Sequence, residues 1–460
     1  MADELKSRAA YAPKNAWSVY KDEAARKEVR AFCDSYIDFL SRCKTERETV
    51  AFCRDFLRAR DFGDDPKGNA YVTSLNGKCL FAFKKGTRPL KEGVRLIIAH
   101  ADCPRLDFKP HPIMEQAGFA QAKTHYYGGL RKYQWLARPL ALHGVIVRDN
   151  GEVVNVCLGE KEGEPVFTIE DLLPHLAQKQ ATKTVREAFE AEKLNVILGS
   201  MPLNADEEKV SEPVKTAILD LLLERYGVSE EDFVSAEVEV VPAGRASYVG
   251  LDSSLVGSYG QDDRICVYTA LRALTDMGRD SENCVLILSD REEIGSEGST
   301  GASSRYFEYC LADVVQAHEP ATPLRHVLLA SYALSADVTA GLDPDYQDVH
   351  EKTNSHSLGY GVCIEKYTGS GGKYGASEAH AEFVGMMRGL LNGRNIPWQA
   401  GELGKVDQGG GGTVSLFLAA LGMNVLDCGP ALLSMHSPFE LSSVVDVYAS
   451  YKAYQAFYEG

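Results

Sequence analysis

A buried strand that ends directly in polar residues constrains this chain more than any other feature. Val94 to Ala99 is an apolar run of strand length, and His100-Ala101-Asp102 follows at once. The polar residues therefore lie at the carboxyl end of a strand. Open α/β sheets bind their ligands in the crevice beyond the carboxyl ends of the strands. The segment thus predicts an α/β sheet with a functional site at one edge.

Four further segments place a histidine or a carboxylate where an apolar run meets a loop. These residues are Asp262 in Gly260–Arg264, Glu292 and Glu293 after the run Val285–Leu288, Asp337 in Leu334–Val338, and His436 in Ser434–Ser437. Each segment alone is explained by a helix cap, a solvated turn or a structural histidine. Their coincidence with His100 predicts one site built from distant parts of the chain.

Imidazole and carboxylate groups suit borderline divalent metals such as zinc, cobalt or manganese, whereas a calcium site uses oxygen alone. Two histidines and three carboxylates fit a pair of ions, with one carboxylate shared and each ion receiving one histidine and one further carboxylate. A water between the ions then has its pKa lowered enough to attack at neutral pH. The ligand set predicts a hydrolytic centre with two divalent ions, zinc before cobalt or manganese.

Glu292 and Glu293 are adjacent, and neighbours on an extended chain point in different directions. We expect one of them to bind metal and the other to take a proton from the water and deliver it to the leaving amine. Asp102, two residues after His100, is placed to orient that imidazole.

The composition excludes several classes of partner. The formal net charge of −16 argues against nucleic acid, because phosphate binding needs clustered Lys and Arg. The 11 cysteines include no CxxC pair, so neither a disulfide framework nor a thiolate zinc site is expected. The N-terminal sequence lacks the apolar core of a signal peptide, and no apolar run could span a bilayer. We expect a cytoplasmic protein without a membrane partner.

A length of 460 residues favours two domains. From about residue 109 the pattern changes to short strands and a Lys-rich acidic middle, and α/β alternation resumes after residue 242. We predict a domain in two parts, 1–108 and 243–460, interrupted by an inserted β-rich domain at 109–242. Periodicity predicts helices over 23–57, 264–277 and 442–458, strands over 69–75, 78–83, 94–99, 141–147, 152–157, 237–241 and 284–289, and a hairpin turn at Asn76-Gly77.

The segments that carry the polar residues, taken in order, resemble the M18 family of metalloaminopeptidases, which includes aspartyl aminopeptidase and vacuolar aminopeptidase I. The resemblance covers nearly the whole chain. It is carried by His100–Pro110, Gly260–Arg264, Ser289–Glu297, Leu334–Val338 and Ser434–Ser437.

This resemblance implies an α/β catalytic domain of the dinuclear metallopeptidase type, interrupted by a β-rich dimerisation domain. It implies a metal-dependent aminopeptidase (EC 3.4.11.-) that removes the N-terminal residue of peptides with a free amino terminus, and a homo-oligomer, a dodecamer built from dimers. By position it makes Asp262 the bridging ligand, pairs His100 with Asp337 and Glu293 with His436, and makes Glu292 the general base.

Three substrate-contacting positions also follow from the resemblance. His175, in Ile169–Leu176, matches a segment that lends a histidine to the active site of the neighbouring subunit, although its spacing alone favours a structural role. Lys366 and Tyr374 resemble positions that contact substrate in the aspartyl enzymes, with the spacing offset by one residue. Two segments depart from the common forms of the family: Ala99–Asp102 is AHAD where relatives often have SHTD, and Gly260–Arg264 is GQDDR where the LDN form is commoner. These departures suggest that the preferred N-terminal residue of the substrate is not acidic.

Two other functions use the same residue types. Related dinuclear sites serve carboxypeptidases and deacylases, and fold does not dictate substrate. A non-catalytic oligomeric binding protein could keep the scaffold, although the intact ligand set argues against it. The sequence leaves open the preferred N-terminal residue, the native metal, the oligomer size and the physiological substrate.

Overall fold

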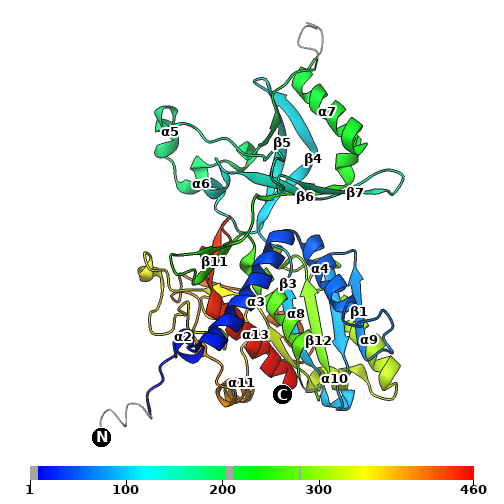
Figure 1. The fold of residues 1–460 in the computed structure, drawn as a ribbon, viewed down its shortest axis with the longest axis vertical. Coiled ribbons are helices and arrows are strands. Elements are labelled where there is room, and N and C mark those ends of the chain that lie inside the picture. Colours follow the sequence, from blue (N-terminus) through cyan, green and yellow to red (C-terminus); the bar gives the residue numbers. More distant parts are fainter. Residues whose placement is uncertain (1–8, 204–210, 279–280) are drawn as a thin grey trace.

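The chain forms two lobes, each built on its own sheet (Figure 1). The computed structural model describes residues 9–203, 211–278 and 281–460. We expect no signal peptide at the N-terminus, and residues 1–8 lie outside the described ranges. Within them, no helix combines the length and the hydropathy that a bilayer span requires.

The lower lobe in Figure 1 is organised by an eight-stranded mixed sheet. In spatial order its strands are β1 (Ala70–Leu75), β2 (Cys79–Lys84), β12 (Cys284–Ser289), β3 (Arg95–His100), β13 (Tyr332–Ser335), β19 (Asn424–Gly429), β15 (Val362–Glu365) and β17 (Trp398–Ala400). β12, β3, β13 and β19 run parallel, and Ser289 at the end of β12 lies beside His100. The carboxyl ends of these central strands therefore meet at one edge.

Helices cover both faces of this sheet, which explains why its central strands are continuous apolar runs. One face carries α2 (Ala16–Val19), α3 (Glu23–Arg42), α4 (Glu46–Arg58), α8 (Gln261–Asp276), α11 (Ala381–Gly393) and α13 (Val444–Glu459). The other carries α9 (Tyr306–His318), α10 (Leu324–Ala330) and α12 (Ser415–Ala420). Alternate strand residues face the two layers, as Ala333 and Leu334 of β13 do.

The predicted hairpin at Asn76-Gly77 is confirmed, since both residues have positive φ and Leu75 pairs with Cys79. The predicted helical stretch 23–57 is two helices, α3 and α4. The break occurs because Thr45 caps α4, with its side chain bound to the backbone of Glu48 and the Glu48 side chain bound back to Thr45.

Two small sheets extend the lower lobe. One has the order β10 (Ser247–Val249), β11 (Leu255–Ser258), β21 (Glu440–Ser443), β20 (Ala431–Leu433) and β14 (Thr339–Ala340). The other pairs β16 (Gly369–Ser370) with β18 (Gly410–Gly411).

The upper lobe is a six-stranded antiparallel sheet that curves around its own core. In order, its strands are β7 (Val153–Leu158), β6 (Leu140–Val147), β9 (Ala236–Pro242), β4 (Arg105–Gln116), β5 (Phe119–Tyr127) and β8 (Val196–Gly199). The helices α5 (Gln178–Ala181), α6 (Val185–Ala188) and α7 (Pro213–Tyr226) belong to this lobe. The predicted strands 141–147, 152–157 and 237–241 are β6, β7 and β9.

Candidate metal centre

The polar residues predicted from the sequence come together at the carboxyl edge of the main sheet. His100 ends β3, Asp262 lies in the first turn of α8, Glu292 and Glu293 open the 3-10 helix η6 (Glu292–Ile294) after β12, Asp337 follows β13, and His436 lies between β20 and β21. All except the more deeply buried His100 line one cavity of about 620 Å³.

Asp262 lies between two histidines. Its Oδ1 is 3.1 Å from Nε2 of His100, and its Oδ2 is 3.2 Å from Nε2 of His436. Asp337 Oδ1 is 3.7 Å from Nε2 of His100, and Glu293 Oε2 is 3.5 Å from Nε2 of His436. Three compact groups of potential ligands result: His100 with Asp262 and Asp337, Asp262 with Glu293 and His436, and His100 with Glu292 and Glu293. The first two groups share Asp262.

Backbone carbonyls orient both imidazoles. Nδ1 of His100 lies 3.0 Å from the carbonyl oxygen of Asp102, and Nδ1 of His436 lies 2.8 Å from that of Gly129. Because a carbonyl oxygen only accepts, each Nδ1 carries the hydrogen and donates it. In a neutral ring each Nε2 then presents its lone pair toward Asp262, which is the tautomer that metal binding through Nε2 requires.

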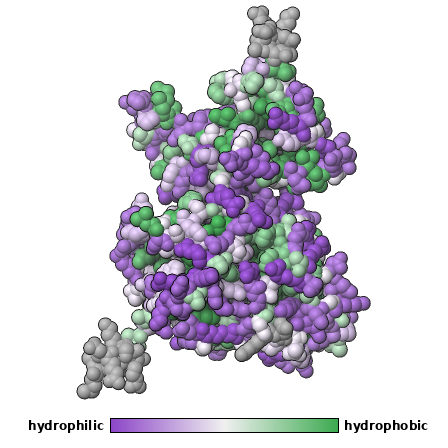
Figure 2. All heavy atoms as spheres, in the orientation of Figure 1, coloured by the Kyte–Doolittle hydropathy of each residue, from purple (hydrophilic) through white to green (hydrophobic). Residues whose placement is uncertain are grey.

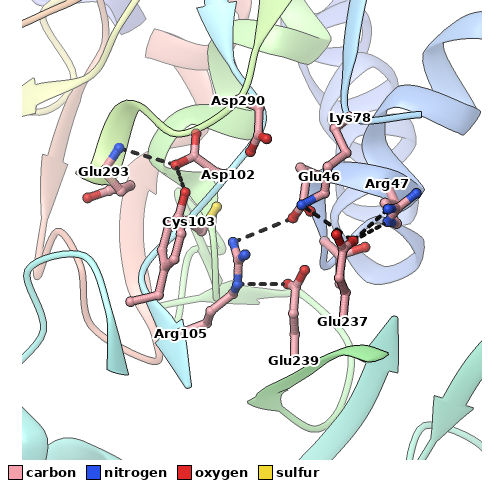
Figure 3. Close-up of polar contacts among 12 residues, drawn as sticks. Glu46, Arg47, Lys78, Asp102, Cys103, Arg105, Glu237, Glu239, Asp290 and Glu293 are labelled. Atoms are coloured by element: carbon pink, nitrogen blue, oxygen red, sulfur yellow. Dashed lines mark hydrogen bonds and ion pairs between the residues drawn. The ribbon is translucent and has the colours of Figure 1, made fainter. Parts of the chain in front are cut away.

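Asp102 is fully buried next to these ligands. Its Oδ1 lies 3.4 Å from Nδ1 of His100, and its two oxygens accept the backbone N–H groups of Glu292 at 3.1 Å and Glu293 at 3.2 Å. The hydroxyl of Tyr127 donates to Asp102 Oδ2 at 2.9 Å. Asp102 therefore fixes the backbone of both adjacent glutamates, and it also contacts His100, which it was expected to orient. Its hydrogen bond with the backbone of Glu293 is drawn in Figure 3.

The expectation that Glu292 and Glu293 lie on extended chain is wrong. They follow Arg291, which has a φ of 67°, and form the 3-10 helix η6. Successive side chains in a 3-10 helix diverge by about 120°, because three residues complete one turn. The two glutamates still point in different directions: Glu293 faces His436, whereas Glu292 lines the cavity without a place in that ligand group.

The cluster of buried carboxylates suits cations. Burial raises the pKa of Glu292 to about 8 and the pKa values of Glu293 and Asp337 above their ordinary range, and neighbouring carboxylates add to each rise. Burial also acts on Asp262, but when the rings of His100 and His436 are protonated at Nε2, their hydrogen bonds and positive charges outweigh burial and lower the pKa of Asp262. Glu293 Oε1 is buried without a hydrogen-bond partner among the described residues. An unsatisfied buried carboxylate oxygen is costly, and a bound cation would satisfy it, so these residues fit a metal centre.

The cavity also includes Glu365, a carboxylate that the sequence did not single out, and a glycine-rich segment that the sequence favoured as a turn near the site. Glu365, at the end of β15, lines it and accepts a hydrogen bond from Thr339, and burial raises the pKa of Glu365 to about 8. Gly409–Gly412 line it too, consistent with a glycine-rich turn whose backbone approaches the site. The signal for Glu365 was weak, because a single carboxylate after a short strand has many structural explanations.

None of the three predicted substrate positions lines this cavity in the single chain, although the neighbours of Lys366 and Tyr374, Tyr367 and Lys373, do. Lys366 is half-exposed and its Nζ lies 3.7 Å from Glu378, while Tyr374 is exposed at the surface. His175 lies in η3 (Pro174–Leu176) of the upper lobe and is exposed. Their roles stay predictions, and that of His175 concerns a neighbouring subunit.

A model of the family described as aminopeptidase I zinc metalloprotease (M18) matches residues 39–458. The chain belongs to the M18 family. A probable M18 family aminopeptidase 1 from Clostridium acetobutylicum is 46% identical over 456 residues, covering 96% of this chain and 97% of the relative. The crystal structure of an M18 aminopeptidase from Thermotoga maritima is 45% identical and has a TM-score of 0.92, covering 98% of this chain and all of the other. A dodecamer, mApe1 of S. cerevisiae, shares the fold at 22% identity and a TM-score of 0.74, covering 94% of this chain and 96% of the other.

Membership in M18 makes the chain a zinc metalloaminopeptidase, a hydrolase of class EC 3.4.11.-. The resemblance to M18 predicted from the sequence is thereby confirmed. The pairing of a main mixed sheet with a separate antiparallel, half-barrel sheet is also that of the M18 structure from Thermotoga maritima. The carboxypeptidase, deacylase and non-catalytic alternatives are set aside.

Proposed function

We propose that the chain removes the N-terminal residue of peptides at a centre of two divalent cations, with zinc the favoured metal and cobalt or manganese as alternatives. His100 and Asp337 hold one ion, Glu293 and His436 hold the other, and Asp262 is shared. The observation that carries this proposal is the contact of both Asp262 oxygens with imidazole Nε2 atoms, at 3.1 and 3.2 Å.

Two such cations, when bound, act as Lewis acids that polarise the scissile carbonyl and favour ionisation of water. Glu292 lines the same cavity, outside both groups that contain Asp262. In this proposal the Glu292 carboxylate accepts the proton of the attacking water and passes it to the amine of the leaving peptide. Asp102 keeps Glu292 in place through its hydrogen bond to the Glu292 backbone N–H group.

We place substrate in the cavity that the metal centre adjoins. Its wall contains Tyr367, whose hydroxyl donates to Glu402 at 3.1 Å, and the glycine-rich segment Gly409–Gly412. Lys366 and Tyr374 flank the loop Tyr367–Lys373, most of which lines the cavity, and this position supports their predicted contact with substrate. We propose that this part of the wall selects the N-terminal side chain, because the metal ligands Asp262, Glu293, Asp337 and His436 form another part of the same lining.

Residues 109–242, which make up most of the upper lobe, are proposed to be the dimerisation domain inserted between the two parts of the catalytic domain, 1–108 and 243–460. Leu172, Leu173 and Leu176 are 45%, 50% and 68% exposed, and they surround His175. Figure 2 shows apolar surface on this lobe. Exposed apolar side chains that cluster mark interaction surfaces, which supports contact of this segment with a neighbouring subunit and the predicted role of His175 there. A dodecamer built from such dimers is the assembly we propose.

Blocking the substrate amine tests the function. The zinc-loaded protein should release the first residue of a short peptide with a free N-terminus and leave the N-acetylated form of the same peptide intact. Reporter substrates with Leu, Lys and Glu as the first residue should be included, because the preferred side chain is open. Cleavage of the acetylated peptide, or release of the last residue, would point to an endopeptidase or a carboxypeptidase instead.

A further inference from the structure

The end of β5, in the upper lobe, and the two glycines that follow it reach the metal centre of the lower lobe. Tyr127, Gly128 and Gly129 contact Asp102, Glu293 and His436 in turn. We propose that Tyr127 is a positioning residue for Glu292 and Glu293, acting through Asp102, and that Gly128 and Gly129 complete this contact. The proposal rests on the metal-centre function given above and assigns the upper lobe a part in aligning it.

The first step is the hydrogen bond of the Tyr127 hydroxyl. It donates to Asp102 Oδ2 at 2.9 Å, and this same oxygen accepts the backbone N–H group of Glu293 at 3.2 Å. Asp102 Oδ1 accepts the backbone N–H group of Glu292 at 3.1 Å. Asp102 is fully buried, so each donor that fixes its orientation also fixes the two glutamates. Partners of this kind commonly affect metal affinity and turnover although they touch neither metal nor substrate.

The second step is what holds the Tyr127 ring. The guanidinium carbon of Arg105 lies 3.9 Å from the ring centroid. Arg105 is itself buried between the lobes, with its nitrogens 3.2 Å from Glu239 of β9 in the upper lobe and 3.4 Å from Glu46 of α4 in the lower lobe (Figure 3). The guanidinium of Arg105 stacks on the Tyr127 ring and is held by one carboxylate from each lobe, so the ring has little freedom to move.

The third step concerns the two glycines. Gly128 has a φ of 73°, and a Cβ added there would lie 3.2 Å from Glu293 Cβ and 3.3 Å from Glu293 Oε2. Only a glycine lets the backbone lie this close to Glu293 without strain. The carbonyl of Gly129 accepts the Nδ1–H of His436 at 2.8 Å. One short segment thus touches both residues proposed to hold the second cation.

The hydroxyl is tested with Tyr127→Phe, which removes one oxygen and keeps the ring that Arg105 covers. Tyr126→Phe is the matched control, because Tyr126 is adjacent and 42% exposed. The readouts are zinc affinity, measured by competition with a chromogenic chelator, and kcat and KM at saturating zinc. Tyr127→Phe should lower kcat or zinc affinity by about 10- to 100-fold with little change in KM, and Tyr126→Phe should resemble the wild type. If Tyr127→Phe has the same kcat and the same zinc affinity as Tyr126→Phe, the proposal is wrong.

A second pair of variants tests the same contact without changing Tyr127. Gly128→Ala adds a methyl group against Glu293, whereas Gly118→Ala, in the turn between β4 and β5, has a similar φ of 78° and meets nothing within 4 Å. Both variants strain the backbone, so their difference isolates the contact with Glu293. Gly128→Ala should lose zinc affinity or kcat relative to Gly118→Ala, and equal behaviour would count against the positioning role. Because zinc affinity is measured without substrate, its loss remains interpretable even if the wild type proves inactive as an aminopeptidase.

Discussion

His436 and Asp262 meet across the site, with Nε2 of His436 3.2 Å from Oδ2 of Asp262. The second oxygen of the same carboxylate lies 3.1 Å from His100. The two groups of ligands are therefore interdependent, because a single orientation of the Asp262 carboxylate serves both. Loss of this one carboxylate should affect both ions.

Replacing Glu292 with Gln removes the proton acceptor and keeps the size of the side chain. We expect kcat to fall by about 10²- to 10⁴-fold, the range typical of a general base, with zinc content unchanged. Glu297→Gln is the control, because Glu297 carries the same change five residues later at an exposed position. The measurements are zinc content by elemental analysis and kcat with an aminoacyl reporter. Near-normal turnover by fully metallated Glu292→Gln would contradict the role of this carboxylate.

Metal content should respond differently to two Asp→Asn variants. Asp262→Asn should lose most of both ions, whereas Asp337→Asn should keep about one, because a shared ligand serves both ions and a terminal ligand serves one. Asp345→Asn, at an exposed position, is the control. Zinc per chain is measured after dialysis against a weak chelator. Two retained ions in Asp262→Asn would exclude it as the shared ligand.

The proposed role of His175 in a neighbouring subunit predicts complementation between two inactive variants. His175→Ala and Glu292→Gln should each be poorly active alone. In a mixed dimer, the Glu292→Gln chain supplies His175 to the intact centre of its partner, so coexpression should restore about a quarter of wild-type activity when subunits pair at random. Activity of purified mixed oligomers that stays at the level of the single variants would place His175 outside the neighbouring site.

The junction between the lobes should add a pH-dependent part to stability. Nδ1 of His143 in β6 lies 2.7 Å from Glu48 of α4, and Nε2 lies 3.1 Å from Glu160, which also pairs with Lys44 at 2.5 Å. Burial alone would lower the pKa of His143, but the hydrogen bonds to Glu160 and Glu48 outweigh it and raise the pKa. A raised pKa means that the stabilisation is complete below the unfolded value of about 6.5 and is lost as pH rises through the folded value.

His143→Gln should therefore lower the melting temperature more at pH 6 than at pH 9.5. The quantity to measure is the difference between wild type and variant at each pH, because other groups titrate in both proteins. His125→Gln, at an exposed position in the same lobe, is the control. A melting-temperature difference for His143→Gln that is the same at both pH values would show that His143 is not charged in the folded protein.

Strand ends explain how much of the site was predictable. His100 was recognisable because an apolar run stops at it, and Asp337 and Glu293 follow central strands in the same way. The adjacent glutamates were predicted, but their 3-10 conformation was not, because it follows a positive φ at Arg291. An arginine in the sequence gives no indication of a positive φ. Local pattern thus predicts which residues reach the sheet edge, and not the turn that presents them.

Contacts between the lobes could not be predicted from local pattern. The hydrogen bond from Tyr127 to Asp102 joins a strand of one sheet to the loop after a strand of the other. Neither residue shows periodicity that reveals its partner, and a tyrosine before two glycines is an ordinary strand end. The same holds for Arg105, whose carboxylate partners come from α4 and β9.

Anomalous scattering from a zinc-loaded crystal, collected on both sides of the zinc absorption edge, tests the central claim most directly. The account predicts two peaks per chain, one beside His100 and Asp337 and one beside Glu293 and His436, with a carboxylate oxygen of Asp262 at each. A single peak, or two peaks that do not share Asp262, would contradict the two-ion centre.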